Sequence, residues 1–167
     1  MPNWCANRVT VYGQPNEIKL FKDFVKREEQ LFSFDAIFPI PEELLEVQSP
    51  VTIVDTEAEV EAYIEEHKHH GSFVCGHPIT KDTQDRLLKE YDYDNWYDWS
   101  CSNWGTKWDA RDVTLVDYWE DGELTYTFDT AWGPPEGIHS MLITKFPTLS
   151  ISWFWDEPGM QMAGYLT

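Results

Sequence analysis

Alternation of apolar and polar residues along the chain predicts five β-strands. Residues 3–12 alternate clearly, with Val9 and Val11 on one side and Thr10 and Tyr12 on the other, until Gly13 ends the run. Four further strands are expected at residues 111–119, 123–130, 148–155 and 160–166. The chain therefore contains enough strands for one sizeable sheet.

Two stretches with helical periodicity separate these strands. Asn16 can cap a helix over about residues 17–29, and a second helix is expected between Pro135 and Pro147. When residues 31–110 are left out, the order is strand, helix, strand, strand, helix, strand and a final strand. This order predicts an α+β fold, a ferredoxin-like βαββαβ sandwich with an added C-terminal edge strand.

The ferredoxin-like order also predicts how the strands are arranged. We expect residues 3–12 and 123–130 at the centre of the sheet, running parallel, with residues 111–119 and 148–155 beside them. The final strand lies at the edge beyond 148–155, and the two helices cover one face.

One hairpin of the sheet has a predicted register. Asp121-Gly122 between the second and third strands is the dipeptide typical of a two-residue turn. This turn would place Trp119 opposite Leu124 and Asp117 opposite Tyr126. Asp117 would then face inward and need a hydrogen-bonding partner.

Residues 31–110 are expected to form a mainly helical insertion in a single domain of 1–167, whose core is residues 1–30 plus 111–167. Thr56 and Glu59 have the spacing of a capping box, which predicts a helix from there to about His70. Further helices are expected at about residues 83–91 and 94–102. The insertion thus differs in structure from the sheet that it interrupts.

Charge narrows the range of possible functions. The chain of 167 residues has a net charge of −18, and residues 31–110 contribute −12 through seventeen acidic and five basic residues. Such a surface disfavours direct binding of a nucleic-acid backbone or an anionic membrane. It permits a protein partner with a basic surface, or mimicry of a polyanion.

Cysteine, signal and histidine patterns give further expectations. Cys5, Cys75 and Cys101 have no paired spacing, and neither a signal peptide nor a membrane helix is visible, so we expect a cytoplasmic protein. Five possible metal ligands fall close together, but their spacing matches no standard site, and we expect no metal and no cofactor. These ligands are His67, His69, His70, Cys75 and His77.

The most distinctive stretch of the sequence is rich in tryptophan and precedes the second strand. Stacking rings, one cation and polar groups make it the candidate binding site, for an aromatic or nucleotide-like ligand or for a partner. The candidate residues are Asn103, Trp104, Lys107, Trp108, Asp109 and Trp132. Alternatively, Trp104 and Trp108 clamp the insertion onto the sheet while Lys107 neutralises nearby carboxylates.

Signs of catalysis are few. Asp109, Asp117 and Asp129 are the carboxylates that could serve acid–base chemistry, because each lies among aromatic or β-branched residues. The sequence has no Gly-x-Ser-x-Gly elbow and no phosphate-binding glycine motif. We therefore assign no catalytic residue, and an enzyme is the less favoured class.

Five motifs resemble those of the Api-like family with a ferredoxin-like domain, in the family's order. They are Pro2-Asn3-Trp4-Cys5-Ala6-Asn7, Phe38-Pro39-Ile40-Pro41, Asn103-Trp104-Gly105-Thr106-Lys107-Trp108-Asp109, Thr130-Ala131-Trp132-Gly133-Pro134-Pro135 and Phe146-Pro147. The resemblance implies the ferredoxin-like fold and a setting on plasmids, phages or other mobile DNA. It supplies no catalytic residues, and the acidic stretch 42–98 is not part of the pattern.

Three functions are compatible with these features. The favoured one is a non-enzymatic acidic interaction protein of a mobile element, such as an anti-defence or regulatory inhibitor that mimics DNA charge against a basic protein. The second is a protein that binds a small nucleotide-like molecule at the tryptophan-rich stretch. The third is a hydrolase that uses buried aspartates.

Overall fold

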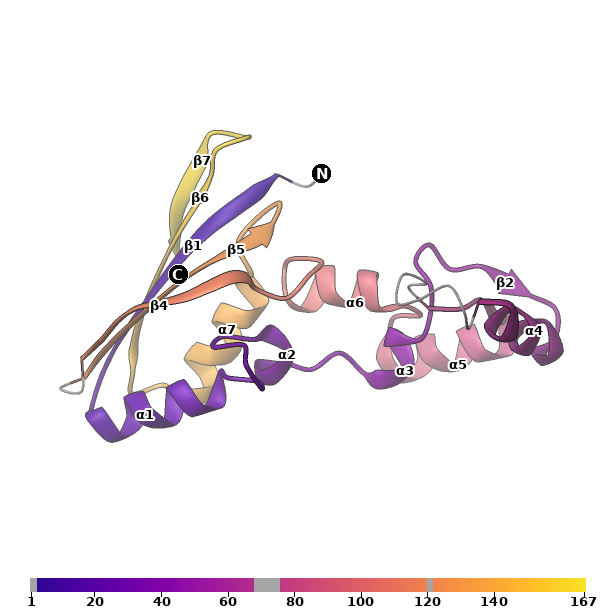
Figure 1. Cartoon of the computed structure of the whole chain (residues 1–167), viewed down its shortest axis with the longest axis horizontal. Helices are drawn as coiled ribbons and strands as arrows, with labels where there is room; N and C mark the ends of the chain where they lie inside the picture. Colours follow the sequence, from indigo (N-terminus) through magenta and orange to yellow (C-terminus); the bar gives the residue numbers. More distant parts are fainter. Residues whose placement is uncertain (1–2, 68–75, 120–121) are drawn as a thin grey trace. The chain divides into compact units, whose positions relative to one another are not determined.

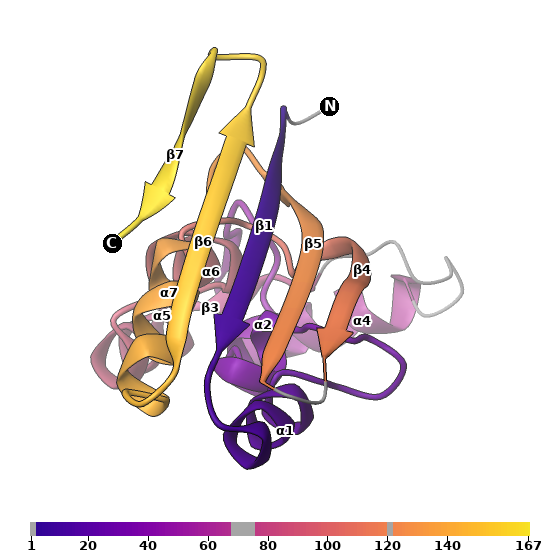
Figure 2. The same ribbon diagram turned by 90° about the vertical axis from the view of Figure 1, so that its left-hand side faces the viewer.

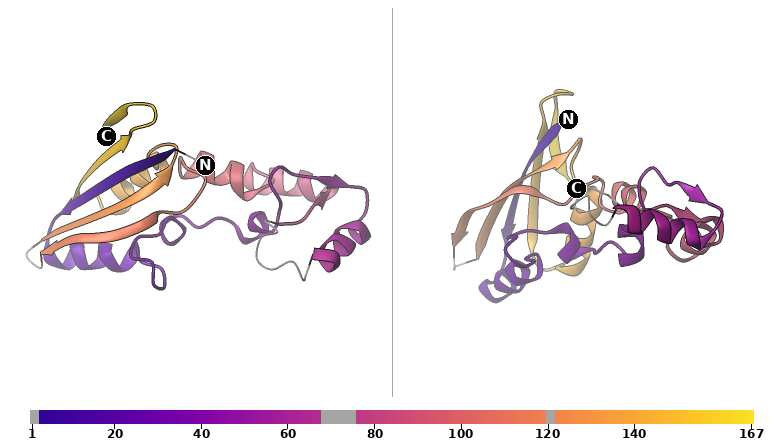
Figure 3. Two further views of the ribbon diagram at one scale, coloured as in Figure 1. Left: turned by 45° about the horizontal axis from the view of Figure 1, so that its top comes forward. Right: turned by 45° about the vertical axis from the view of Figure 1, so that its right-hand side comes forward.

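A five-stranded antiparallel sheet dominates the computed structural model, which describes residues 3–67, 76–119 and 122–167 (Figure 1). The strands are β1 (Trp4–Tyr12), β4 (Arg111–Trp119), β5 (Glu123–Ala131), β6 (Ser150–Glu157) and β7 (Met162–Leu166). Their order across the sheet is β4-β5-β1-β6-β7. This confirms the ferredoxin-like fold and the added edge strand, and the further views show the same continuous sheet (Figure 3).

The predicted parallel pairing of the two central strands is wrong. β1 and β5 pair antiparallel, with Trp4 opposite Ala131 and Tyr12 opposite Glu123. The physical reason lies in the split βαβ unit. Its crossover makes β1 and β4 parallel but leaves a gap of one strand between them, and β5 fills that gap after a hairpin that reverses its direction.

The chain forms two compact units, the sheet unit (Met1–Pro39 and Ser102–Thr167) and the helical unit (Ile40–Cys101). The sheet unit therefore takes in residues 31–39 and 102–110, beyond the predicted core of 1–30 plus 111–167. The extra residues supply Phe32 and Phe34, both fully buried, which pack edge-on or stacked against Phe128. The sheet needs these two rings to complete its core.

Helices α1 (Pro15–Phe24), α2 (Phe34–Ile37) and α7 (Glu136–Lys145) lie behind one face of the sheet (Figure 2). Alternation along β1 buries Val9 and Val11 on this face, where Phe21 and Trp153 are also fully buried. Pro15 occupies the first turn of α1, a position where the missing N–H costs no helical hydrogen bond. The opposite face carries the alternate residues of the same strands.

A polar network lies within this apolar core. The side-chain amide of Asn7 donates to the backbone oxygen of Cys5 at 2.9 Å and to the hydroxyl of Thr130 at 2.8 Å. Its oxygen accepts from the indole N–H of Trp153 at 3.0 Å. Because Asn7 and Trp153 are both buried, this network joins the three central strands through side chains as well as backbone.

The predicted register of the β4–β5 hairpin is also wrong. Trp119 pairs with Glu123, one position short of the predicted Leu124, and a second irregularity separates Leu115 from Asp117. Asp117 thus pairs with Thr125 and does not reach the predicted position opposite Tyr126. This shift by one position, which the Asp-Gly signal does not reveal, moves Asp117 to the other face of the sheet.

The described residues of the helical unit form four helices and a short parallel strand pair. These elements are α3 (Glu42–Leu45), β2 (Ile53–Val54), α4 (Glu57–His67), β3 (Ile79–Thr80), α5 (Lys81–Tyr91) and α6 (Trp96–Asn103), whose last two residues belong to the sheet unit. The capping box before α4 is confirmed, since Glu59 N–H donates to Thr56 Oγ1 and Thr56 N–H donates to Glu59 Oε2. Among the described residues, no helix is long and apolar enough to cross a membrane.

His139 of α7 is expected to make the sheet unit sensitive to mild acid. Its ring is buried against Trp153, and burial lowers its pKa. Near pH 6.5 the His139 imidazole therefore binds a proton in the unfolded chain but not in the folded protein. The free energy of unfolding falls as the pH drops below that value. Thermal unfolding from pH 7.5 to 5.5 should show this loss in the native protein and a smaller loss in His139→Gln. Equal losses in both would contradict the assignment.

Candidate functional site

The tryptophan-rich stretch begins with a ring that is sealed inside the sheet unit. Trp104 is only 2% exposed, and its indole N–H donates to the backbone oxygen of Phe38 at 2.7 Å. Its ring meets Phe34 edge-on at 5.8 Å. Trp104 therefore joins two segments that are 66 residues apart in sequence.

Asp109 holds the start of α2. Its carboxylate accepts from the backbone N–H of Phe34 at 2.6 Å, the hydroxyl of Ser33 at 2.7 Å and the N–H of Ala110 at 2.7 Å. Burial raises the pKa of Asp109, while the hydrogen bonds from Phe34, Ser33 and Ala110 oppose that rise. With both oxygens engaged, this carboxylate serves as a distant helix cap.

The backbone of Asn103 lies directly against the first turn of α7. Gly137 N–H donates to the backbone oxygen of Trp104 at 3.2 Å. A Cβ at Gly137 would meet the backbone oxygen of Asn103 at 1.8 Å, so only glycine fits there. This close approach fixes where the tryptophan-rich stretch leaves α6.

The remaining candidates gather into an aromatic and cationic cluster. Lys107 Nζ lies 3.8 Å from the ring centre of Trp108 and 4.2 Å from that of Trp132. Trp108 is also 6.1 Å from Trp4, and the Arg111 guanidinium lies 5.7 Å from Trp4 and 5.9 Å from Trp108. We call Trp4, Lys107, Trp108, Arg111 and Trp132 the tryptophan cluster.

The tryptophan cluster contains two residues that the sequence prediction missed. Trp4 comes from β1 and Arg111 from β4, on either side of β5 in the sheet. Trp132 is 41% exposed, and its backbone N–H donates to the oxygen of Asn3 at 2.8 Å. The only sequence signal was the presence of an aromatic residue at the start of β1 and a cation at the start of β4.

The other candidate carboxylates do not join Asp109. Asp129 lies on the sheet face away from the helices, opposite Arg111 and Ala6. Burial, and then the negative charge of Asp112, raise its pKa. Asp117 pairs with Thr125, four positions along β5 from Asp129, so the three aspartates are not brought to one site.

Of the cysteine and histidine candidates that the structure describes, Cys5 is buried in the sheet unit, and His67 and His77 line one hollow of the helical unit. Burial raises the pKa of Cys5 to about 11, which keeps its thiol protonated at neutral pH. His69, His70 and Cys75 fall outside the described residues. Among those described, no group of three His, Cys, Asp or Glu side chains could hold a metal ion.

Comparison with known protein families identifies a match to part of the chain. Residues 103–167 match the family model described as the ferredoxin-like domain in Api92-like protein. The predicted resemblance to the Api-like family is confirmed. This match begins at Asn103, so it includes the rest of the tryptophan-rich stretch, β4 to β7 and α7.

A solved Api92 structure has the same fold over nearly the whole chain. The crystal structure of protein api92 from Yersinia pseudotuberculosis aligns with a TM-score of 0.57 at 12% identity, covering 99% of this chain and 93% of that chain. At this identity the likeness concerns the fold. No curated protein sequence matches the chain.

The helical unit, Ile40–Cys101, lies outside the residues that match the Api92-like domain. It carries fifteen acidic and four basic residues, a net charge of −11, and every acidic residue except Asp94 is exposed. Among the described residues, Arg86 forms ion pairs with Glu43 and Glu90, and Lys81 forms one with Asp85. Surface pairs of this kind neutralise charge locally and stabilise little.

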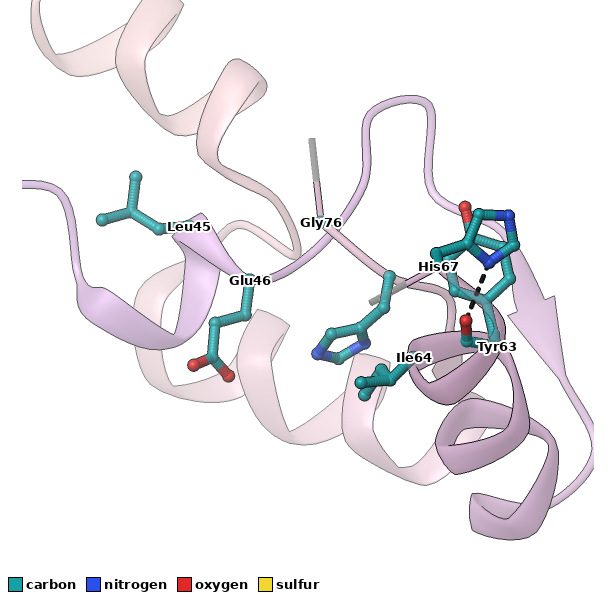
Figure 4. A pocket seen from close by; sticks show the side chains of 7 residues that line it. Leu45, Glu46, Tyr63, Ile64, His67 and Gly76 are labelled. Atoms are coloured by element: carbon teal, nitrogen blue, oxygen red, sulfur yellow. Dashed lines mark hydrogen bonds between the residues drawn. The ribbon is translucent and has the colours of Figure 1, made fainter. Parts of the chain in front are cut away.

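One hollow of about 490 Å³ lies within the helical unit. Leu45, Tyr63, Ile64 and His67 line part of it, and Glu46 contributes a carboxylate (Figure 4). The His67 ring stacks on Tyr63 with centroids 4.0 Å apart, and its Nδ1 lies 2.8 Å from the Tyr63 backbone oxygen. These contacts orient the imidazole against its own helix.

Proposed function

We propose that the protein is a non-enzymatic interaction protein whose helical unit binds a basic surface on a protein partner. The observation that carries the proposal is the exposure of fourteen of the fifteen acidic residues in the helical unit. Exposed carboxylates keep their hydration, so their field extends into the solvent and attracts a partner of opposite charge. The setting on mobile DNA that the family resemblance implies would suit an anti-defence or regulatory inhibitor.

We propose more specifically that helix α4 mimics the charge of DNA. Its exposed glutamates are Glu57, Glu59, Glu61, Glu65 and Glu66. At 1.5 Å of rise per residue, these five charges span about 14 Å, or roughly one charge every 3 Å. A single DNA strand carries one phosphate about every 3.4 Å. A protein surface that binds DNA phosphates could therefore accept this helix.

Capture of partners at two salt concentrations tests the function. The full chain, immobilised, should retain basic nucleic-acid-binding proteins from a lysate at about 50 mM NaCl and release most of them at about 300 mM. The triple variant Glu61→Gln, Glu65→Gln, Glu66→Gln should retain at least about tenfold less. Glu57 and Glu59 stay unchanged because they bond to Thr80 and Thr56.

A second triple variant shows whether partner binding depends on where the charges lie or only on the net charge of the chain. Asp23→Asn, Glu28→Gln and Glu29→Gln remove the same three charges from exposed positions in the sheet unit. This variant should retain the same proteins as the native chain within about twofold. Equal losses from both triple variants, or no basic protein retained by the native chain, would overturn the proposal.

The alternative functions have less structural support. Trp104 and Asp109 are engaged within the sheet unit, and Lys107 already lies between two rings, which leaves exposed Trp132 as the main surface for a nucleotide-like ligand. A hydrolase would need two cooperating carboxylates, whereas Asp109 is fully engaged as a cap. We therefore favour the interaction protein.

A further inference from the structure

A second surface of the sheet unit has a different chemical character from the rest of the chain. The face of the sheet turned away from α1 and α7 is the one toward the viewer in Figure 2. This face carries a groove lined by residues of β1, β6 and β7. The groove encloses about 350 Å³, which lies within the range of small-molecule sites. Its lining residues are Arg8, Thr10, Tyr12, Ser152, Phe154 and Tyr165.

The strand register explains why these six side chains converge. Arg8 pairs with Phe154, Thr10 with Ser152, and Phe154 with Tyr165, so the residues occupy successive cross-strand positions on one face. Side chains of paired residues stand roughly 5 Å apart. The groove is therefore built from regular strands, which hold its groups in fixed positions.

The groove has one cationic wall and one aromatic wall. None of the described residues forms an ion pair with Arg8, which is exposed at the centre of β1. The Phe154 and Tyr165 rings meet edge-on at 5.2 Å and are 37% and 65% exposed. Thr10 and Ser152 form the next cross-strand pair on the same face, two positions along from Arg8 and Phe154. An arginine with nearby hydroxyls suits a phosphate, and exposed rings suit a planar ring.

Neighbouring carboxylates limit how much negative charge a ligand can bring. On the other side of Arg8 and Phe154, a hollow of about 300 Å³ is lined by Asp112, Asp129 and Asp156. Beyond the opposite end, Tyr12 pairs with Glu123. A polynucleotide would place further phosphates against these carboxylates, and repulsion would oppose its binding. One phosphate at Arg8 avoids them.

We propose that this groove binds a ligand of the nucleoside monophosphate class, with its phosphate at Arg8 and its base against Phe154 and Tyr165. The two hydroxyls, of Thr10 and Ser152, are then placed to donate to phosphate oxygens. This site is separate from the tryptophan cluster and does not depend on the interaction function of the helical unit.

Calorimetric titration of the full chain with AMP, GMP, CMP and UMP tests the site. At least one of them is expected to bind with a submillimolar Kd, while adenosine and inorganic phosphate each bind about tenfold more weakly or not at all. ATP and a short single-stranded DNA should bind more weakly than the monophosphate because of their extra charges. Failure of all four nucleotides to bind at millimolar concentration would overturn the proposal.

Substitutions locate the site. Arg8→Gln should raise the Kd at least about tenfold, and Arg8→Lys should raise it less because the charge remains. Phe154→Leu should weaken the nucleotide while leaving phosphate unchanged. The matched control is Arg111→Gln, which removes an exposed arginine next to Trp4 and Trp108 and should change the Kd less than about twofold.

The control also distinguishes the two surfaces of the sheet unit. A loss of binding in Arg111→Gln equal to that in Arg8→Gln would place the nucleotide at the tryptophan cluster and overturn the groove assignment. Unchanged binding in Arg8→Gln would do the same. Circular dichroism and thermal unfolding should match the native protein in every variant, since Arg8, Phe154 and Arg111 are exposed.

Discussion

Replacing Asp109 with alanine is expected to lower the free energy of unfolding by about 3 kcal/mol. The alanine would leave the N–H groups of Phe34 and Ala110 and the hydroxyl of Ser33 without their acceptor, in a part-buried environment. Each buried donor left unpaired costs about 1–3 kcal/mol, and partial hydration recovers some of the total. Urea unfolding followed by fluorescence at pH 7 measures the change.

Two further variants show whether the acceptor is what matters at Asp109. Asp109→Asn keeps one acceptor oxygen, so it should lose less stability than Asp109→Ala. Asp112→Asn removes an exposed carboxylate three residues away, at a left-handed backbone position that asparagine also adopts, and should change stability by less than about 0.5 kcal/mol. If Asp109→Ala were as stable as the native chain, α2 would not depend on this distant cap.

Asn7→Leu is expected to destabilise the sheet unit by about 2–3 kcal/mol. Leucine has a similar volume but cannot accept the indole N–H of Trp153, which lies 3.0 Å from Asn7 Oδ1 in the core. It also removes the donor to Thr130 and the Cys5 backbone oxygen. Differential scanning calorimetry should show a lower Tm. The circular dichroism spectrum of the folded protein should stay unchanged.

A double-mutant cycle isolates the bond between Asn7 and Trp153. Trp153→Phe removes the indole donor, so Asn7→Leu should cost less in that background than in the native one. A coupling of about 1 kcal/mol is expected for a buried pair that shares a hydrogen bond. Strictly additive losses would show that the two side chains stabilise the core independently.

The order of the strands could be predicted because it depends on local signals. Alternation in residues 3–12 and the helical face of Ile18 and Phe21 are properties of short stretches, and the short chain leaves few connections between them. The same reasoning predicted the capping box at Thr56 and Glu59, which the hydrogen bonds of α4 confirm.

The direction and register of the strands were harder to predict. The antiparallel pairing of β1 with β5 follows from the topology, once the hairpin reversal is counted, and the sequence reasoning failed at that step. The shift of Asp117 follows from the one-position slip near the turn, and a bulge at Val116 then separates Asp117 from Leu115. A bulge costs little free energy, and packing against neighbouring strands decides whether it forms. No residue type in the strand therefore predicts it.

For the candidate site too, the sequence predicted contacts between neighbouring residues but not contacts between distant ones. Local sequence brought together Lys107 and Trp108, which are adjacent, and indicated that Trp104 could serve as a clamp. It could not show that Asp109 caps a helix 75 residues earlier, nor that Trp4 and Arg111 join the cluster. The groove around Arg8 was missed because its members alternate with core residues on three separate strands.

The contacts between residues 30–38 and 104–110 form a bonded neck at the point where the chain leaves the sheet unit and returns. Gln30 bonds to Ala110, Phe34 to Asp109, and Phe38 to Trp104. The entropy of closing a flexible loop grows only slowly with its length, by about 0.6 kcal/mol per doubling. Because these hydrogen bonds close the neck, the length or the charge of the segment beyond it can change while the sheet unit keeps its stability. The sheet unit can thus support interaction surfaces of different size and charge.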